Sequence, residues 1–120
     1  MSKIKGVKGF KDVFEGAKFY RHTLDRSRSV LEGHFGYRQL LLNMLERKET
    51  FSRTLGLSSD IVQKEMYNLT DLGGNELVLR PEGTAGAMRF LLSNREMMRT
   101  IEKEPVRMWY WGPMFRYERP

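Results

Sequence analysis

Arg116 and Glu118 are the residues of this chain whose types and spacing suit chemistry most directly. They lie two positions apart in a stretch with strand-like alternation, so both side chains project from one face, roughly 6.5–7 Å apart. A guanidinium can hold a phosphate through two hydrogen bonds, and a carboxylate accepts from an amino group. The pair therefore suits a polyanion that carries a polar ring. A surface ion pair is the alternative, and spacing alone favours it.

A strand beginning near Val106 would position this pair. Alternation places two sets of side chains on its opposite faces. One face carries Arg107, Trp109, Trp111, Phe115 and Tyr117, and the other carries Met108, Tyr110, Met114, Arg116 and Glu118. The stretch closes the sequence without a return strand beside it. An apolar edge of this kind is expected to favour aggregation.

The composition is that of an ordinary globular chain. Of its 120 residues, 40% are hydrophobic and 30% are charged, which suits one domain with a real core but not two domains. The sequence has neither an apolar run long enough to span a membrane nor the apolar centre of a secretory signal. The lack of cysteine excludes disulfides and thiolate metal sites, and we expect a cytoplasmic protein. The net charge of +6 permits a nucleic-acid partner without requiring one.

Residues 14–35 are predicted to form a helix of about five turns. Apolar or aromatic side chains recur there at helical spacing, at Phe14, Ala17, Tyr20, Leu24, Leu31 and Phe35. We expect this helix to pack on a sheet, with Phe14 and Leu24 buried. Its charged face is interpreted as solvated, with an RNA-binding stripe as the alternative. His22 and His34 are isolated from other ligand-type residues and are interpreted as surface histidines, not metal ligands or catalytic bases.

Shorter elements follow Gly36, which stands where glycine favours the end of a helix. A buried strand is predicted within residues 37–45, although the leucines there favour a helix almost as well. Residues 46–55 are compatible with a helix. Ser58 or Ser59 is placed to cap another short helix that ends at Lys64.

The next stretch predicts a hairpin that leads into a second long helix. Residues 66–70 and 76–80 are strand-like and flank a turn with two glycines. Pro81 suits the first helical turn, and apolar spacing continues the helix from Ala85 to Asn94. Glu82 stands where the positive end of the helix dipole favours a carboxylate, so a purely structural role is one interpretation of it. The polar residues that follow, 95–104, are expected to form a surface connection.

Two stretches together resemble the histidyl-tRNA synthetases, a family of class II aminoacyl-tRNA synthetases. They are Leu79-Arg-Pro-Glu-Gly-Thr-Ala-Gly86 and Gly112-Pro-Met-Phe-Arg-Tyr-Glu-Arg-Pro120, and the second contains the class II motif 2 pattern Phe-Arg-x-Glu. The similarity extends to Gln63-Lys-Glu-Met-Tyr67, Asp60-Ile-Val62, Gly36-Tyr37 and the opening Gly6-Val-Lys-Gly-Phe-Lys-Asp12. It covers nearly the whole chain in the order of the family.

The resemblance implies a role for each site residue. Glu82, Gly83 and Thr84 match the loop that binds the α-amino group of histidine. Arg116 matches the arginine that contacts the ATP α-phosphate and the histidine carboxylate, and is the implied catalytic residue. Glu118 matches the acidic residue that faces the adenine. The implied reaction is Mg²⁺-assisted formation of histidyl-adenylate from histidine and ATP, then transfer to tRNA, with no protein metal ligand assigned.

The resemblance also implies the fold: an α+β, partial class II catalytic domain, with an antiparallel sheet and flanking helices, over residues 1–120 and without a second domain. Family elements beyond motif 2 do not occur in these residues, so we expect a fragment with little or no activity alone. Asn43 and Glu49 stand where the family carries proline in motif 1, a dimer element, so the homodimer of the family is open here. A non-catalytic relative that binds histidine or tRNA, such as the regulatory subunit of ATP phosphoribosyltransferase, is the alternative.

Overall fold

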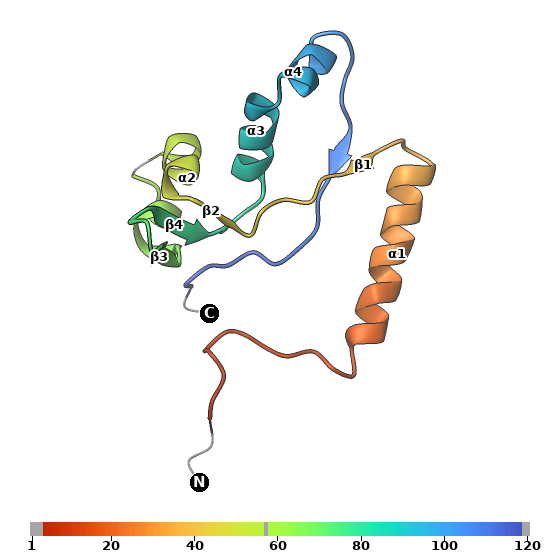
Figure 1. Ribbon diagram of the computed structural model, residues 1–120. Helices are drawn as coiled ribbons and strands as arrows, with labels where there is room; N and C mark the ends of the chain where they lie inside the picture. The colour runs from red at the N-terminus through yellow and green to blue at the C-terminus, as the bar shows by residue number, and fades with distance from the viewer. Residues whose placement is uncertain (1–3, 57, 119–120) are drawn as a thin grey trace. The chain divides into compact units, whose positions relative to one another are not determined.

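The computed structural model describes residues 4–56 and 58–118 (Figure 1). The chain divides into two units, residues 1–36 and residues 37–120. Its elements in chain order are α1 (Ala17–Gly33), β1 (Arg38–Gln39), β2 (Leu45–Arg47), α2 (Lys48–Leu55), the π-helical turn η1 (Ile61–Glu65), β3 (Asn68–Thr70), β4 (Glu76–Leu79), α3 (Thr84–Ser93), α4 (Arg95–Ile101) and β5 (Met108–Trp109). None of the helices within the described ranges is long and apolar enough to cross a membrane.

The first unit contains the predicted long helix, α1, which is shorter at both ends than its apolar pattern indicated. It begins at Ala17, so Phe14 precedes it and is 92% exposed, which makes the prediction of a buried Phe14 wrong. Leu24 is half-buried. Gly36 adopts a left-handed conformation with φ of 66°, as expected just beyond the end of a helix. Packing of α1 on a sheet stays a prediction.

A three-stranded antiparallel sheet, in the order β2-β4-β3, forms the centre of the second unit. The predicted hairpin is confirmed: Asn68 pairs with Val78 and Thr70 with Glu76. β2 pairs along the other edge of β4, with Glu46 opposite Val78. The predicted α+β class with an antiparallel sheet is therefore confirmed.

The hydrophobic core of this unit lies between α2, η1, β4 and α3. It is formed by Phe51, Val62, Met66, Val78 and Ala85, with Leu55 and Ile61 packed against them. Phe51 and Val78 are completely buried. Ser59 caps the turn over residues 61–65, because its Oγ accepts a hydrogen bond from the Val62 N–H at 3.3 Å. The short helix predicted there is thus present as a π-helical turn, and it ends at Glu65, one residue later than expected.

The stretch at residues 37–45 is not one strand, contrary to the prediction. β1 pairs in parallel with β5, and β2 joins the other sheet. Between them, the carbonyl of Leu42 accepts a hydrogen bond from the Arg80 side chain, and the carbonyl of Met44 accepts one from the Arg80 backbone N–H at the end of β4. Leu41, expected in a buried run, is 80% exposed. The backbone cannot continue a ladder where its acceptors are already used.

The predicted strand from Val106 through Glu118 is also interrupted. Only Met108 and Trp109 form a ladder, and Gly112 has φ of 151°, which strands do not adopt. Pro113 follows and has no N–H to donate. Beyond it, the chain makes separate backbone bonds, from Phe115 N to Arg80 O at 2.9 Å and from Tyr117 N to Glu65 O at 2.8 Å. The two-face alternation therefore stops at Gly112.

Residues 95–101 form helix α4, where the sequence analysis predicted only a surface connection. Its start has a local cause: the side chain of Asn94 accepts a hydrogen bond from the Met97 N–H at 3.1 Å. Glu96 in the first turn is favoured by the helix dipole. None of its residues is buried, so apolar periodicity could not indicate it.

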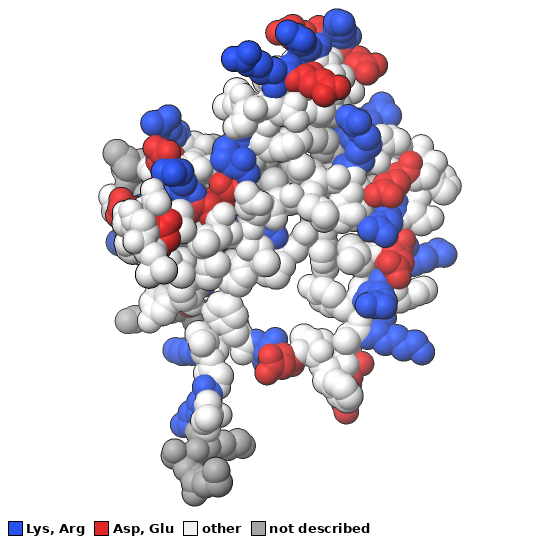
Figure 2. Space-filling view, viewed as in Figure 1, with Lys and Arg blue, Asp and Glu red and all other residues white. Residues whose placement is uncertain are grey.

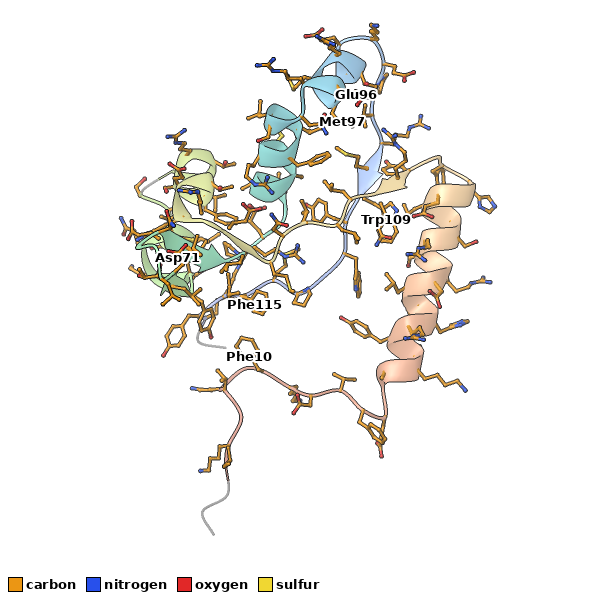
Figure 3. All side chains as sticks on the ribbon, viewed as in Figure 1. Phe10, Asp71, Glu96, Met97, Trp109 and Phe115 are labelled. Atoms are coloured by element: carbon orange, nitrogen blue, oxygen red, sulfur yellow. The ribbon has the colours of Figure 1, made fainter. Side chains whose placement is uncertain are left out.

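Asp71 organises the turn between β3 and β4 (Figure 3). Its carboxylate accepts from the side-chain amide and the backbone N–H of Asn75, both at 2.8 Å. Gly74, with φ of 79°, supplies the left-handed position that this turn needs. The hydrogen bonds from the side chain and then the backbone of Asn75 lower the pKa of Asp71 below its ordinary 3.8.

Phe51→Ala tests the position of the core. Phe51 is completely buried, so truncation should lower the free energy of unfolding by about 3–5 kcal/mol. Urea denaturation followed by circular dichroism measures it. Phe14→Ala is the matched control, because Phe14 is 92% exposed, and it should change stability by less than about 0.5 kcal/mol. Equal effects of the two substitutions would contradict the described core.

Ionisation of Asp71 predicts an acid-dependent component of stability. Because the native pKa is lowered, this stabilisation is complete above the ordinary value of 3.8 and is lost as the pH falls through the native pKa. Urea midpoints measured from pH 5 downward should therefore fall more steeply for the wild type than for Asp71→Asn. The amide keeps an acceptor for the Asn75 N–H but does not titrate. Parallel profiles would show that Asp71 contributes nothing to the acid sensitivity.

Candidate functional site

Arg116 lies beside the segment that carries Glu82 and Thr84. Its Nε donates to the carbonyl oxygen of Pro81 at 3.0 Å, and its Nη1 lies 3.2 Å from Oε1 of Glu118. The side chains of Arg116 and Glu118 are 39% and 53% exposed. The surface ion pair considered from the sequence is therefore present. A pair this exposed contributes about 1 kcal/mol or less, so a ligand can displace it at small cost.

Glu82 closes the N-terminus of α3. One carboxylate oxygen accepts from the Ala85 N–H at 2.9 Å, and the other accepts a very short bond from the Thr84 N–H. These bonds satisfy donors that the first turn of a helix leaves without a partner. The predicted structural role of Glu82 thus exists. Each carboxylate oxygen still has a second lone pair, so the same group can also accept from a cation.

Tyr110 is a site residue that the sequence analysis left without a role. Its hydroxyl lies 3.2 Å from Oγ1 of Thr84, so the two hydroxyls share a hydrogen bond. Its ring lies over Gly83, where an added Cβ would stand 2.3 Å from Cε2 of Tyr110. Glycine is required at position 83 by this close approach, and its φ of −105° is ordinary. The strand-like alternation of the sequence predicts Tyr110 on the same face as Arg116. That shared face is the sequence feature that could have indicated a role for Tyr110.

The sequence analysis also gave no role to Arg80, although it directly precedes the loop that carries Glu82 and Gly83. It is 4% exposed, and its guanidinium donates to the carbonyl oxygens of Pro113 at 2.9 Å and of Leu42 at 3.1 Å. These bonds connect the loop before α3 with the segment that carries Arg116. Phe115, next to Arg116, donates its N–H to the Arg80 carbonyl (Figure 3).

Of the five residues assigned from the sequence, Glu82, Gly83, Thr84 and Arg116 thus lie around the start of α3 together with Tyr110, and Glu118 is joined to them through Arg116. The site has a negative group at Glu82 and a positive group at Arg116, joined through the Pro81 carbonyl. A zwitterion, with an ammonium and a carboxylate on one carbon, needs one binding group of each charge. A hollow of 560 Å³ lies at the end of the segment that carries Arg116. It is lined by Lys64, Glu65, Tyr117 and Glu118.

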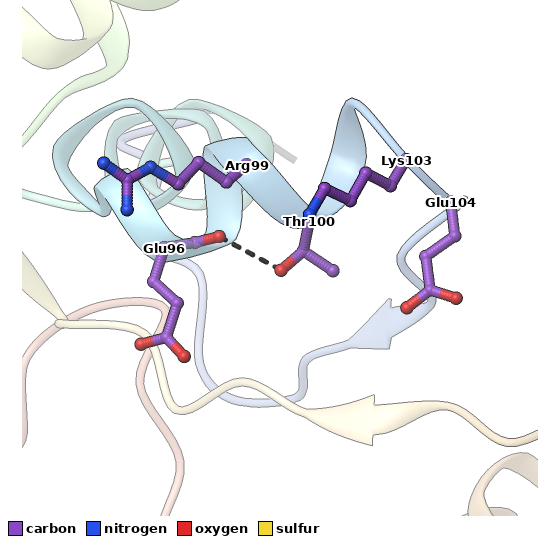
Figure 4. Close-up of a pocket in the computed structure, with 5 residues that line it drawn as sticks. All are labelled: Glu96, Arg99, Thr100, Lys103 and Glu104. Carbon is purple, nitrogen blue, oxygen red and sulfur yellow. Dashed lines mark hydrogen bonds between the residues drawn. The ribbon is translucent and has the colours of Figure 1, made fainter.

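On the face shown in Figure 2, Lys and Arg side chains are interspersed with Asp and Glu side chains over α1 and α4. This mixture of charges does not favour the RNA-binding stripe considered for α1. A hollow of 480 Å³ on α4 is lined by Glu96, Arg99, Thr100, Lys103 and Glu104 (Figure 4). Two acidic and two basic side chains balance there, and the Thr100 hydroxyl is used by the Glu96 carbonyl at 3.0 Å. No site is assigned to it.

Within residues 4–56 and 58–118, no three His, Asp or Glu side chains are grouped so that they could hold a metal ion. His22 and His34 are both exposed.

A family model for histidyl-tRNA synthetases matches residues 9–120. The chain belongs to the histidyl-tRNA synthetase family. It is 42% identical over all 120 residues to a histidine–tRNA ligase of Francisella tularensis, of which it spans 28%. It is 44% identical over 118 residues to the histidine–tRNA ligase of Halorhodospira halophila, covering 98% of this chain and 27% of that protein. The chain therefore spans somewhat more than a quarter of these relatives.

Solved structures confirm the predicted class II fold. The apo histidyl-tRNA synthetase of S. aureus superposes with a TM-score of 0.73 and 26% identity, over 96% of this chain and 30% of that one. A histidine–tRNA ligase subunit from Alicyclobacillus acidocaldarius gives a TM-score of 0.78 at 24% identity, over 97% and 32%. A Bacillus halodurans protein described as an ATP phosphoribosyltransferase regulatory subunit/histidyl-tRNA synthetase gives 0.71 at 24% identity, over 97% and 28%. The last two matches establish the fold alone.

Gly83→Ala tests the close approach of Tyr110. The new Cβ would stand 2.3 Å from the ring, so Tyr110 must move and its bond with Thr84 should break. We expect a loss of about 1–3 kcal/mol in unfolding free energy, measured by urea denaturation. Gly33→Ala is the control, since an added Cβ at that helical glycine meets nothing within 4 Å. If Tyr110→Ala does not relieve the effect of Gly83→Ala, the proposed steric cause is wrong.

Proposed function

We propose that this chain carries the histidine- and ATP-binding part of a histidine–tRNA ligase. The observation that supports it most is the bond from Arg116 Nε to the Pro81 carbonyl at 3.0 Å. This bond holds the cation of one family motif beside the carboxylate of the other, in a chain whose family is established. The chain spans about a quarter of its relatives, so the activity of the whole protein is part of the proposal.

Histidine is proposed to bind as a zwitterion. Glu82 and the Thr84 hydroxyl accept from its ammonium group, while Arg116 donates to its carboxylate. Gly83 lets the Tyr110 ring pack against this loop, and Tyr110 orients the Thr84 hydroxyl through the 3.2 Å contact. Because Glu82 also accepts from the first turn of α3, its carboxylate is fixed before histidine arrives. A preorganised acceptor loses little side-chain entropy on binding.

The proposed reaction is the activation of histidine. A carboxylate oxygen of histidine attacks the α-phosphorus of ATP, a new phosphorus–oxygen bond forms, and the bond to the pyrophosphate oxygen breaks. Negative charge grows on the phosphoryl oxygens as the phosphorus becomes pentavalent. The Arg116 guanidinium stabilises this charge more strongly than that of the bound substrate, which lowers the barrier. Glu118 is proposed to accept from the adenine amino group after its exposed pair with Arg116 opens.

The remaining partners are expectations from the family. Mg²⁺ would accompany the ATP phosphates, and tRNA would accept the activated histidine. A homodimer and a cytoplasmic location stay predictions. The dimer prediction is open, because Asn43 and Glu49 stand where the family carries proline in motif 1.

Histidine-dependent exchange of pyrophosphate into ATP tests the proposed function. We would replace the aligned residues of the Francisella tularensis ligase, which match this chain over its full length, with these 120 residues. The chimera should catalyse exchange only when histidine is present, whereas the isolated 120 residues are expected to show little or none. A folded chimera that binds histidine but does not exchange would contradict the proposal.

Arg116→Ala in the same chimera tests the catalytic assignment. Loss of the guanidinium should lower the exchange rate by about 100-fold or more, because it removes charge stabilisation in the transition state. Arg28→Ala is the matched control: Arg28 is 52% exposed and its ion pair with Glu32 is long, at 3.9 Å. It should leave the rate within about twofold. An Arg116→Ala chimera with wild-type rates would refute the assigned role.

A non-catalytic regulator that binds histidine is the second candidate. The fold match to the Bacillus halodurans protein favours keeping it, although that match supports the fold alone. The chimera distinguishes the two candidates, because a regulator would supply histidine binding without pyrophosphate exchange.

A further inference from the structure

We infer that Arg80 is a positioning residue for histidine activation, which holds the segment bearing Arg116 in its reactive place. The inference rests on the proposed function. Arg80 itself is 4% exposed and is not expected to contact either substrate. It acts through the backbone of two segments that are far apart in the sequence.

Four hydrogen bonds connect Arg80 to these segments. Toward the loop between β1 and β2, its Nη1 donates to Leu42 O at 3.1 Å and its backbone N donates to Met44 O at 2.9 Å. Toward the Arg116 segment, its Nε donates to Pro113 O at 2.9 Å, and its carbonyl accepts from Phe115 N at 2.9 Å. Arg80 therefore aligns the loop between β1 and β2 with the segment that carries Arg116.

The guanidinium is buried without a carboxylate partner among the described residues. The ion pairs found there involve other arginines and lysines. Burial of an unpaired cation is costly unless its N–H groups find acceptors, and here backbone carbonyls accept from Nε and Nη1. A planar guanidinium offers several donors in fixed directions, so it can serve Leu42 O and Pro113 O together. A lysine ammonium is a point charge on a flexible stem and cannot reproduce that fork.

Gly112 is fitted to the same guanidinium. A Cβ at position 112 would stand 2.3 Å from Nη2 of Arg80, and φ of 151° disfavours any other residue. The backbone therefore approaches the guanidinium more closely than a side chain would allow. The turn at Gly112–Pro113 and the buried arginine form one unit.

The consequence for Arg116 follows from its own contacts. The N–H of Phe115, the residue before Arg116, donates a hydrogen bond to the Arg80 carbonyl. The Nε of Arg116 donates a hydrogen bond to the carbonyl of Pro81, the residue after Arg80. Displacement of residues 112–115 would move the Arg116 backbone relative to Pro81. A shift of about 1 Å can lower a rate 100-fold, because charge stabilisation depends on alignment. Histidine binding at Glu82, which is fixed by α3, should change much less.

A double-mutant cycle in the chimera tests this inference. Arg80→Lys should lower kcat for histidine-dependent pyrophosphate exchange by about tenfold or more, with KM for histidine within about threefold. In the Arg116→Ala background, Arg80→Lys should cause almost no further loss, because its effect passes through Arg116. Additive losses, or a change confined to KM for histidine, would overturn the inference.

Arg89→Lys is the matched control, since Arg89 also makes a bidentate contact with a buried group. Its Nε and Nη2 donate to the Glu46 carboxylate at 2.8 and 2.7 Å, so these bonds join α3 to β2 and not to residues 112–116. We expect lower thermal stability with kcat within about twofold. If Arg89→Lys lowers kcat as much as Arg80→Lys, loss of stability explains both.

Hydrogen exchange provides a readout that does not require activity. In the 120-residue chain, Arg80→Lys should raise amide exchange at residues 112–117 by about tenfold, while the hairpin at residues 68–79 keeps its wild-type rates. Uniform acceleration, or none, would overturn the inference. If the wild-type chimera shows no exchange of pyrophosphate, the proposed function fails, and hydrogen exchange alone decides whether Arg80 holds the segment.

Discussion

The carbonyl oxygens of Leu42 and Pro113 face one buried guanidinium, and the site depends on that arrangement. Arg80 belongs to the loop between β4 and α3, so it connects the central sheet with the helix whose start carries Glu82. The same residue contacts the irregular segment at residues 40–44, where the Leu42 carbonyl accepts from the Arg80 side chain and the Met44 carbonyl from the Arg80 N–H. Regular strand structure is thus absent at the point where hydrogen bonds of Arg80 join the two segments.

The charged groups of the site are each engaged within the protein. Glu82 closes α3, Arg116 bonds to Pro81, and Glu118 pairs with Arg116. These contacts differ in how easily a ligand can replace them. The cap of α3 can persist while a cation binds to its second lone pairs, whereas the exposed pair between Arg116 and Glu118 must open. The fixed carboxylate and the replaceable pair therefore suit different substrates, a zwitterion and a nucleotide.

Local patterns in the sequence predicted the elements that local patterns determine. The hairpin at Asp71–Asn75, the helix from Thr84 and the capped turn at Ser59 follow from turn glycines, spacing and caps. The parallel pairing of β1 with β5 could not be predicted in this way, because the two strands share no periodicity in the sequence. α4 lacks a buried face, and its Asn94 cap was the only indication. The family motifs supplied the predicted site residues, but Tyr110 and Arg80 emerged only from their contacts.

The pairing of Arg38 with Met108 also sets an order in which the second unit can form. The hairpin closes a loop of a few residues, whereas β1 and β5 are separated by about 70 residues, and contact over longer separations is slower. During synthesis on the ribosome, the hairpin and α3 can fold while Arg116 is still in the exit tunnel. Within this unit, the segment that carries Arg116 is therefore expected to join after the hairpin and α3 have formed.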